Sequence, residues 1–265
     1  MARPARTPLG PALAAVAALA LLISLPASAG RTNQSSALWH VVHDLCVTDM
    51  KVSGLPAPCV AVNLGQGYAV LKDLRGKTQL LLIPTARVTG IESPALLSRK
   101  SPNYWQDAWD ARPLFERGAG KPVPREDLGL AINSEFGRTQ NQLHIHIDCL
   151  KPAVRDALAA DRDRIDDTWS DFTVPFYGHH YRVRRVSGED LAPHDPFRLL
   201  AEDPRARDDM AHETLVVAGA QFDKDKPGFY LLSDRADLAH WNEGAGEELL
   251  DHSCAALTEP AVGGH

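Results

Sequence analysis

The sequence predicts a single α+β domain built around an antiparallel sheet, and three observations support this fold class. Short β-rich runs follow one another across hairpin-like connections, which is typical of a meander. Amphipathic helical patterns lie before, between and after these runs. The sequence contains no internal repeat, low-complexity tract or second linker. We therefore expect one elaborated domain over residues 30–265.

Residues 1–29 are predicted to direct the chain out of the cytoplasm and to lie outside the fold. Arg3 and Arg6 precede an apolar run from Ala12 to Leu25, and Ala27-Ser28-Ala29 offers a small-residue cleavage site. The run is shorter than the roughly 20 residues that a spanning helix needs. We therefore expect a cleaved signal peptide, with an uncleaved N-terminal membrane anchor as the alternative. Either way the protein is exported.

The four cysteines agree with export into an oxidising compartment. Three pairings are possible. The short Pro- and Gly-containing segment between Cys46 and Cys59 can fold back, which favours that pair and leaves Cys149 with Cys254. The alternative is four buried thiols. A zinc site is less favoured, because the chain has no Cys-x-x-Cys pair.

The charge of the chain limits its partners. A formal net charge of -6 makes the molecule mildly acidic. Nucleic-acid phosphates require a basic face, so we expect no nucleic-acid partner. A local basic pocket for one diphosphate is compatible with this charge.

The first part of the domain is expected to hold a helix and a three-stranded meander. The helix covers residues 36–45, starts at Ser36 as its N-cap, and buries Leu38, Val41, Val42 and Leu45. Strands follow at residues 59–62, 68–71 and 79–83, separated by turn-forming segments. Pro84 ends the meander, since proline has no N–H to donate to a central ladder.

The rest of the domain is expected to alternate between helices and strands. Residues 103–115 form a helix that Pro113 breaks at its end, and its Trp105 and Trp109 are expected in the core rather than in a lipid cleft. Strands at 128–132 and 143–150 flank a polar loop, and a charged amphipathic helix covers 154–169. A Tyr-, His- and Arg-rich segment, two strands and a last helix are expected at residues 176–186, 214–218, 229–232 and 239–254.

The strand at 143–150 carries the predicted chemistry. Alternate residues of a strand share a face, so three apolar side chains point into a core and three polar ones, His144, His146 and Asp148, point the other way. Polar groups on a buried face lose solvation and need a reason to be there. Directly before them, residues 137–141 form a donor-rich loop that can bind phosphate oxygens.

On composition alone, three roles are open for His144 and His146. One neutral imidazole can attack phosphorus while the second orients it or protonates the leaving group. Alternatively, the pair belongs to a zinc site with a third ligand such as Asp148, His179 or His180. In the third interpretation both histidines are structural.

A family resemblance favours the first role. The order Asn133, Gln140-Asn141 and His144-Ile145-His146 resembles the signature of the histidine-triad superfamily of nucleotide hydrolases and transferases. The longer string from Ala131 to Ile147 is similar to bacterial CDP-diacylglycerol pyrophosphatases. The similarity covers the mature chain, including Leu38-Trp39-His40, Val62-Asn63-Leu64, Glu92-Ser93-Pro94, Gly178-His179 and Asp251-His252.

The resemblance implies a histidine-triad-like antiparallel sheet flanked by helices. It also implies hydrolysis of CDP-diacylglycerol to CMP and phosphatidate, at the periplasmic face of a bacterial inner membrane, without a metal or other cofactor. Laid on this chain without gaps, the pattern places His144 first and His146 at the nucleophile's position. Asp148 then stands where the superfamily has a third histidine or a glutamine, so the proton donor to phosphatidate is not assigned. A rival register starts at Gln142 and makes His144 the nucleophile.

Further residues are candidate substrate ligands. Asn133 either orients the nucleoside or a histidine, or it ends a strand in a turn. Arg138, beside Gln140 and Asn141, either grips phosphate bidentately or is a solvated loop charge. His179, Arg184 and Arg185 form either a basic wall for the diphosphate and anionic headgroups or a solvated surface.

Two other classes of function stay open. One is a zinc-dependent phosphoesterase. The other is a periplasmic protein that binds a nucleotide or lipid without turnover.

Overall fold

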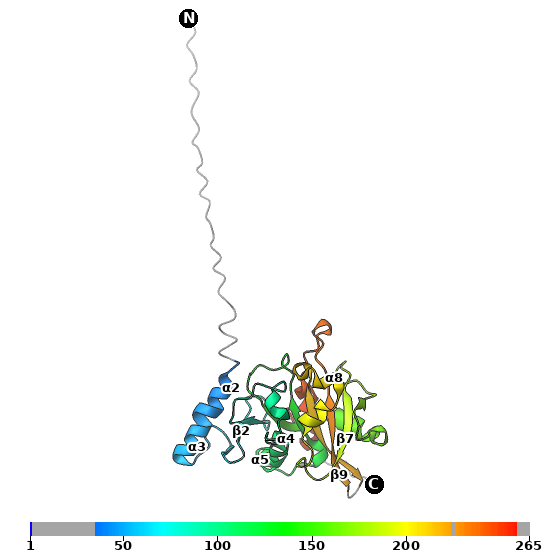
Figure 1. The fold of residues 1–265 in the computed structure, drawn as a ribbon, viewed down its shortest axis with the longest axis horizontal. Helices are drawn as coiled ribbons and strands as arrows, with labels where there is room; N and C mark the ends of the chain where they lie inside the picture. The colour runs from blue at the N-terminus through cyan, green and yellow to red at the C-terminus, as the bar shows by residue number, and fades with distance from the viewer. Residues whose placement is uncertain (2–34, 224–225, 259–265) are drawn as a thin grey trace.

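The computed structural model describes residues 35–223 and 226–258, together with Met1. The predicted segment 1–29 therefore lies outside the described residues, apart from Met1. The described chain forms one α+β domain around a ten-stranded sheet in which every pairing is antiparallel, as predicted (Figure 1). This architecture is compatible with the histidine-triad-like fold that the resemblance implies.

The sheet runs in the order β1-β2-β3-β5-β4-β8-β9-β7-β6, and β10 pairs with the end of β5. The strands are β1 (Ala61–Asn63), β2 (Tyr68–Lys72), β3 (Leu80–Pro84), β4 (Leu128–Ile132), β5 (Ile145–Leu150), β6 (Ser170–Asp171), β7 (Arg182–Ser187), β8 (Leu215–Asp223), β9 (Lys226–Ser233) and β10 (Leu250–Asp251). The predicted meander is β1 to β3, and Pro84 is its last residue.

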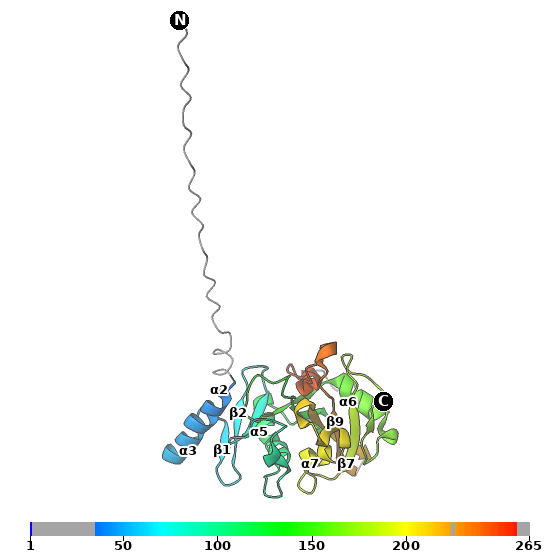
Figure 2. The ribbon, with the colours of Figure 1, turned by 45° about the horizontal axis from the view of Figure 1, so that its top comes forward.

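Helices cover both faces of this sheet (Figure 2). They are α2 (Ala37–His40), α3 (Val47–Ser53), α4 (Tyr104–Asp110), α5 (Arg112–Ala119), α6 (Pro152–Ala160), α7 (Pro196–Ala201), α8 (Pro204–Arg207) and α9 (Ala255–Thr258). One π-helical segment, Val41–Cys46, joins α2 to α3, and short 3-10 turns occur at Pro94–Leu97, Arg125–Asp127, Arg162–Arg164, Met210–His212, Leu238–His240 and Gly246–Leu249.

The two faces of the sheet are packed differently. One face is a continuous apolar core in which Ile145 and Ile147 of β5 meet Trp105, Trp109 and other side chains of α4 and α5. The opposite face has two separate apolar clusters. One packs the α2–α3 segment on β2 and β3, and the other packs α6 and residues 165–183 on β4, β8 and β9. His144 and His146 belong to neither cluster, so the polar face of β5 lies between the two clusters.

The first helix is longer than predicted, and it is built differently. It continues to Ser53 instead of ending at residue 45, and Ser36 makes no side-chain capping hydrogen bond. The π-helical segment adds a residue to the turn and rotates the inward face. As a result Cys46 is fully buried, whereas Leu45, predicted in the core, is exposed.

Three other predicted helices were wrong in extent or type. Residues 103–115 form two helices, because Pro113 sits in the first turn of α5, where proline is tolerated, instead of ending α4. The helix predicted at 154–169 ends at Ala160, and charged residues then form an exposed 3-10 turn.

No helix forms at 239–254, where 3-10 turns and β10 replace it. Gly244 there has a positive φ of 66°, which ends any regular helix. Gly246 lies so close to the sheet that a Cβ would clash with Thr214 Oγ1.

Both predicted disulfides, Cys46–Cys59 and Cys149–Cys254, are present. The first ties the π-helical segment to the start of the meander. The second ties the end of the described chain to β5, the strand that carries the histidines. In the described part of the chain, no helix has the length and apolar character needed to cross a membrane.

The disulfides should differ in their contribution to stability. In the loop-entropy model, Cys149–Cys254, which spans 105 residues, should stabilise more than Cys46–Cys59, which spans 13. We expect Cys149→Ser/Cys254→Ser to lower the free energy of unfolding by about 4–5 kcal/mol, and Cys46→Ser/Cys59→Ser by about 3 kcal/mol. Denaturant titration measures both, and the reverse order would contradict this account.

Candidate active site

A cavity of about 810 Å³ opens on the polar face of β5, within the range of small-molecule sites. Its lining combines apolar and polar side chains. The apolar ones come mainly from the start of α2 and from β2 and β3, and they include Ala37, Leu38, Val41, Leu71, Leu74 and Leu81. The polar ones include both histidines, and they are Lys72, Asp73, Arg75, Asn133, Thr139, Gln140, His144, His146, Glu243 and Glu247.

His144 is held by a backbone hydrogen bond. Its Nδ1 lies 2.7 Å from the carbonyl oxygen of Gln142. A carbonyl oxygen only accepts, so Nδ1–H is the donor and Nε2 carries the lone pair. Burial, reinforced by the neighbouring His146, lowers the pKa of His144 to about 4. His144 is therefore neutral at pH 7, with its unprotonated nitrogen fixed.

His146 has a different environment. Its Nδ1 lies 2.7 Å from Nε2 of Gln79, 3.3 Å from a carboxylate oxygen of Glu247 and 3.9 Å from one of Asp73. Its Nε2 is buried without a hydrogen-bond partner in the described chain. Burial lowers the pKa of His146 to about 4, against the opposing effect of Asp73. An unpaired buried ring nitrogen at a cavity is suited to exchange a proton with a ligand.

The two imidazoles lie side by side, with ring centroids 5.0 Å apart and planes at 68°. Glu247 connects this pair to a cation, because its other carboxylate oxygen lies 3.3 Å from Nη1 of Arg75. The backbone N–H of Glu247 donates to the side-chain oxygen of Asn133 over 3.1 Å. Asn133 thus fixes the backbone of Glu247, whose carboxylate faces His146.

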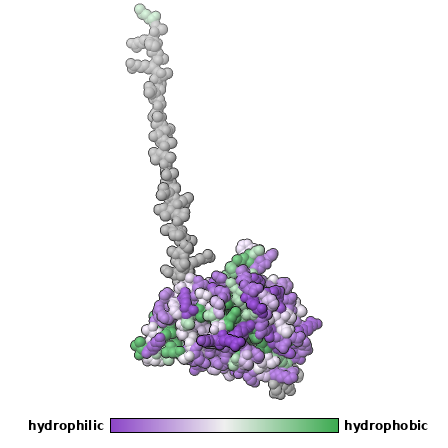
Figure 3. All heavy atoms as spheres, viewed as in Figure 1, coloured by the Kyte–Doolittle hydropathy of each residue, from purple (hydrophilic) through white to green (hydrophobic). Residues whose placement is uncertain are grey.

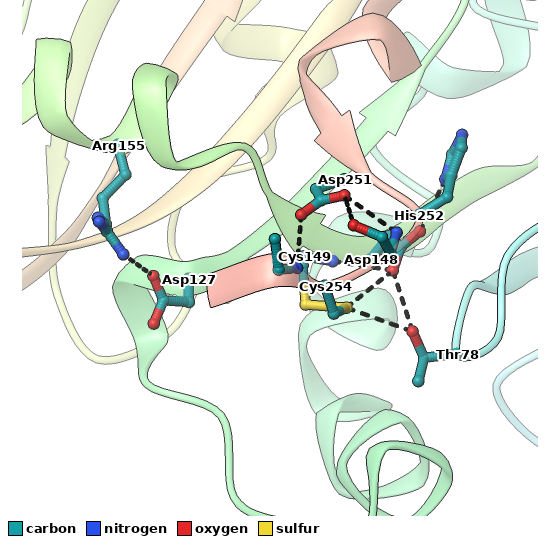
Figure 4. The surroundings of a disulfide bond; sticks show 10 residues. Thr78, Asp127, Asp148, Cys149, Arg155, Asp251, His252 and Cys254 are labelled. Carbon is teal, nitrogen blue, oxygen red and sulfur yellow. Dashed lines mark hydrogen bonds and ion pairs between the residues drawn. A yellow bond between two sulfur atoms is a disulfide. The ribbon is translucent and has the colours of Figure 1, made fainter. Parts of the chain in front are cut away.

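Asp148, predicted as catalytic, is fully buried and does not line this cavity. Its carboxylate accepts hydrogen bonds from Nδ1 of His252 at 2.8 Å, from the Cys149 amide at 2.9 Å and from the Thr78 hydroxyl at 3.3 Å (Figure 4). Burial raises its pKa, and the bond from His252 opposes that rise. Asp148 therefore orients His252 beside the Cys149–Cys254 disulfide.

Only some residues of the predicted phosphate-binding loop, 137–141, line the cavity, and the others make contacts that hold the loop in place. Gln140 lines the cavity, and its side-chain oxygen accepts the backbone N–H of Leu38 over 3.0 Å. Arg138 is engaged elsewhere in a bidentate ion pair with Glu92, at 2.6 and 2.8 Å. The Asn141 side chain accepts from Arg138 Nε, 3.3 Å away. These contacts hold the loop against α2 and Glu92.

The predicted basic wall lies away from the histidine pair. His179 bonds Glu248 at 2.8 Å and lines a separate cavity of about 720 Å³ together with His180. Arg184 pairs with Glu202 at 2.8 Å, and Arg184 and Arg185 line a third cavity. The zinc alternative needed a third ligand beside His144 and His146, and none of Asp148, His179 and His180 lines their cavity. Among the described residues, the one cluster with metal-ligand spacing includes the two disulfide sulfurs of Cys149 and Cys254.

Several residues of the site were not predicted from the sequence. Gln79, Asp73, Arg75 and Glu247 reach His146 or its neighbours from the β2–β3 connection and from the C-terminal segment. The one signal for His252 was its place in the resemblance, two residues before Cys254. The others have no local pattern, since pairing across the sheet brings them together.

Two neutral imidazoles beside carboxylates and a cation can perform nucleophilic and acid–base chemistry on a ligand in the cavity. Fold and site together are compatible with an enzyme of the hydrolase class. A sequence model of a family described as CDP-diacylglycerol pyrophosphatase matches residues 33–258. A Yersinia pestis protein named CDP-diacylglycerol pyrophosphatase is 42% identical over 245 residues, which cover 90% of this chain and 93% of the relative. The chain belongs to the CDP-diacylglycerol pyrophosphatase family.

Acid should destabilise the folded protein through this histidine pair. Burial lowers both pKa values from 6.5 to about 4, so the unfolded chain binds more protons between these pH values. The free energy of unfolding should therefore fall as the pH falls from 6.5 to 4, by about 1 kcal/mol per pH unit for each histidine. Above pH 6.5 the two histidines should not contribute to the pH dependence of the free energy of unfolding.

Denaturant titrations across this pH range measure the effect. The matched control is His144→Gln/His146→Gln, which should lose this part of the slope. An unchanged slope in the double variant would show that the two histidines are not the groups that titrate.

Proposed function

We propose that this protein hydrolyses the pyrophosphate bond of CDP-diacylglycerol to CMP and phosphatidate through a cytidylyl-histidine intermediate. Family membership and the name of the relative support the substrate. The cavity adds support, because its lining combines apolar side chains suited to a lipid with polar side chains suited to a diphosphate. One observation carries the mechanism: the Gln142 carbonyl holds His144 in the tautomer whose Nε2 lone pair is free to attack.

In the proposed first step, Nε2 of His144 attacks the phosphorus that carries cytidine. A P–N bond forms, and the bond from that phosphorus to the bridging oxygen breaks. Phosphatidate leaves with the bridging oxygen, which takes a proton from Nε2 of His146. Approach of the anionic diphosphate raises the pKa of His146 and so charges it for this transfer.

In the second step, water attacks the same phosphorus and the P–N bond breaks. His146, now neutral, accepts the proton of the water, and CMP is released with His144 regenerated. The gapless family register assigned the attack to His146. The hydrogen bonds instead support the register that begins at Gln142, in which His144 attacks and His146 transfers protons.

The cations of the β2–β3 connection are the proposed diphosphate ligands. Arg75 lines the cavity and lies beside Glu247. Lys72 donates to the carbonyl oxygens of Asp73 at 2.7 Å and Gly76 at 3.0 Å, which fixes the loop that presents Arg75. A guanidinium can bind two phosphate oxygens at once.

The proposed site of action is the periplasmic face of the inner membrane. The predicted export segment, the two disulfides and a membrane lipid as substrate support this location. The first thirty residues then serve either as a cleaved signal or as an anchor.

Replacement of the two histidines tests the mechanism. CMP release by His144→Ala should fall by roughly 10³-fold or more, because the nucleophile is lost. After denaturing quench, the wild type and His146→Ala should retain radioactive CMP on the protein, and His144→Ala should not. Label on His144→Ala but not on His146→Ala would reassign the attack to His146.

The same assay separates the other functions. Activity should persist in EDTA, and its loss with recovery in zinc would instead establish the zinc-dependent phosphoesterase. A wild type that binds CDP-diacylglycerol without releasing CMP would be a binding protein.

A pair of arginines tests the diphosphate ligand. Arg75→Ala should lower kcat/KM by about 10- to 100-fold, since a charge-assisted contact to phosphate is lost. Arg184→Ala is the matched control, because Arg184 pairs with Glu202 outside this cavity. Equal losses in the two variants would contradict the placement of the substrate.

A further inference from the structure

Leu74 lies at the mouth of the histidine cavity without packing on the protein. It lines the cavity, yet its side chain is 102% exposed. Its connection between β2 and β3 is nevertheless fixed, because the Lys72 side chain donates to backbone carbonyls on both sides of Leu74. Gly76 packs on His252, where a Cβ would meet the histidine Cβ at 3.2 Å. A rigid loop thus holds an apolar side chain in solvent at the entrance.

A second loop with exposed apolar side chains lies just before residues that line the histidine cavity, while its own Asp237 and His240 line the separate cavity that holds His179. Residues 237–241 are all exposed, and the loop rises above the body of the protein on the side where α2 begins (Figures 1 and 2). Its tip carries Leu238, 52% exposed, and Trp241, 92% exposed. Figure 3 shows this projection as partly hydrophobic, next to a largely hydrophilic surface. Glu243 and Ala245, directly after the loop, line the cavity.

The projecting loop has a firm base. The backbones of Asp237 and Asn242 exchange hydrogen bonds of 2.8 and 3.0 Å, and the Asn242 side chain donates to buried Asp234 over 2.8 Å. Trp241 has a positive φ of 61°, a conformation that costs a non-glycine residue free energy. The fold thus holds Trp241 in a strained conformation while its ring buries little surface.

The start of the described chain reaches the same place. Ala37 and Leu38 of α2 line the cavity, and Gln140 fixes the Leu38 amide there. The apolar run Ala12 to Leu25 precedes α2 in the sequence. The described chain therefore begins beside the cavity and runs away from it toward the end of α3 (Figure 1).

We propose that Leu74, Leu238 and Trp241 insert into a lipid bilayer and place the cavity mouth on its surface. This inference rests on the proposed lipid substrate, whose acyl chains lie in the bilayer and whose diphosphate must reach His144. Tryptophan is favoured at the membrane–water interface because its ring is amphipathic. An isolated leucine inserted beside it removes apolar surface from water.

The charges around the mouth of the histidine cavity indicate which kind of lipid surface the protein binds. Two cations, Lys72 and Arg75, line the cavity together with three carboxylates, Asp73, Glu243 and Glu247. A lining without net positive charge gives little attraction to anionic headgroups, so insertion of apolar side chains drives docking. Binding should therefore be similar on phosphatidylcholine vesicles and on vesicles with added phosphatidylglycerol.

Quenching of tryptophan emission tests docking without any turnover. The full chain is mixed with phosphatidylcholine vesicles whose acyl chains are brominated. The emission of Trp241 should be quenched, and the quenching should be largely absent in Trp241→Phe, since Trp39 is covered by His43 and Arg87 and the other tryptophans are buried or half-buried. Equal quenching of the two proteins, or none, would overturn the proposal. Dimers that Trp241→Glu dissociates, without quenching by lipid, would mark the face as a protein interface instead.

A comparison of two substrates tests the consequence for catalysis. Leu74→Glu/Trp241→Glu should lower hydrolysis of vesicle-embedded CDP-diacylglycerol at least tenfold more than hydrolysis of monomeric CDP-dibutanoylglycerol. Val52→Glu is the matched control, because Val52 is 83% exposed but lies in α3, away from the cavity. The ratio of its activity on the vesicle-embedded substrate to its activity on the monomeric substrate should equal that of the wild type.

Equal losses on the two substrates in the double variant would overturn the proposal. A wild type inactive on both substrates would refute the proposed function, while the quenching experiment would still decide docking.

Discussion

The burial of the polar face of β5 is the constraint on which the rest of the structure depends. The strand packs isoleucines into the main core on one face and carries His146 and Asp148 on the other, with His144 directly before its first residue, and all three polar side chains are buried. Each buried ring or carboxylate needs a partner, or it costs free energy. The Gln142 carbonyl, Gln79, Glu247 and His252 supply those partners. Because burial also lowers both histidine pKa values, the same constraint produces neutral imidazoles at physiological pH.

The partners come from both ends of the domain, and this explains the shape of the fold around the site. The start of α2, the meander and the C-terminal segment all contribute to the lining of the cavity. The Cys149–Cys254 disulfide fixes that segment to β5, so Asp148 and His252 meet beside it. Residues 239–254 contain little regular structure of their own that could hold Glu247 against His146. The Cys149–Cys254 disulfide therefore helps to hold this segment in place. The two loops with exposed apolar tips are attached to these same segments.

Local patterns were sufficient to predict the α+β class, β4 and β5, the meander and both disulfides. Alternation along β5 placed the histidines on one face, because that rule depends on neighbouring residues alone. Helix extents were predicted less well, since a π-helical turn, a proline within a first turn and close-packed glycines depend on tertiary contacts. The sequence also could not show that Arg138 pairs with Glu92, 46 residues away. Because of this ion pair Arg138 does not line the cavity, and the cations that do, Lys72 and Arg75, belong to β2 and the β2–β3 connection. The family register favoured His146 as the nucleophile, whereas the hydrogen bonds favour His144, because that choice depends on which ring nitrogen each neighbour engages.

The tautomer of His144 tests the account most directly. Nitrogen NMR of the histidine side chains, assigned with His144→Gln and His146→Gln, distinguishes a protonated Nδ1 from a protonated Nε2. The account predicts that His144 is neutral at pH 7 and carries its proton on Nδ1, where the Gln142 carbonyl accepts it. A proton on Nε2, or a charged ring at pH 7, would remove the lone pair that attacks phosphorus and contradict the mechanism.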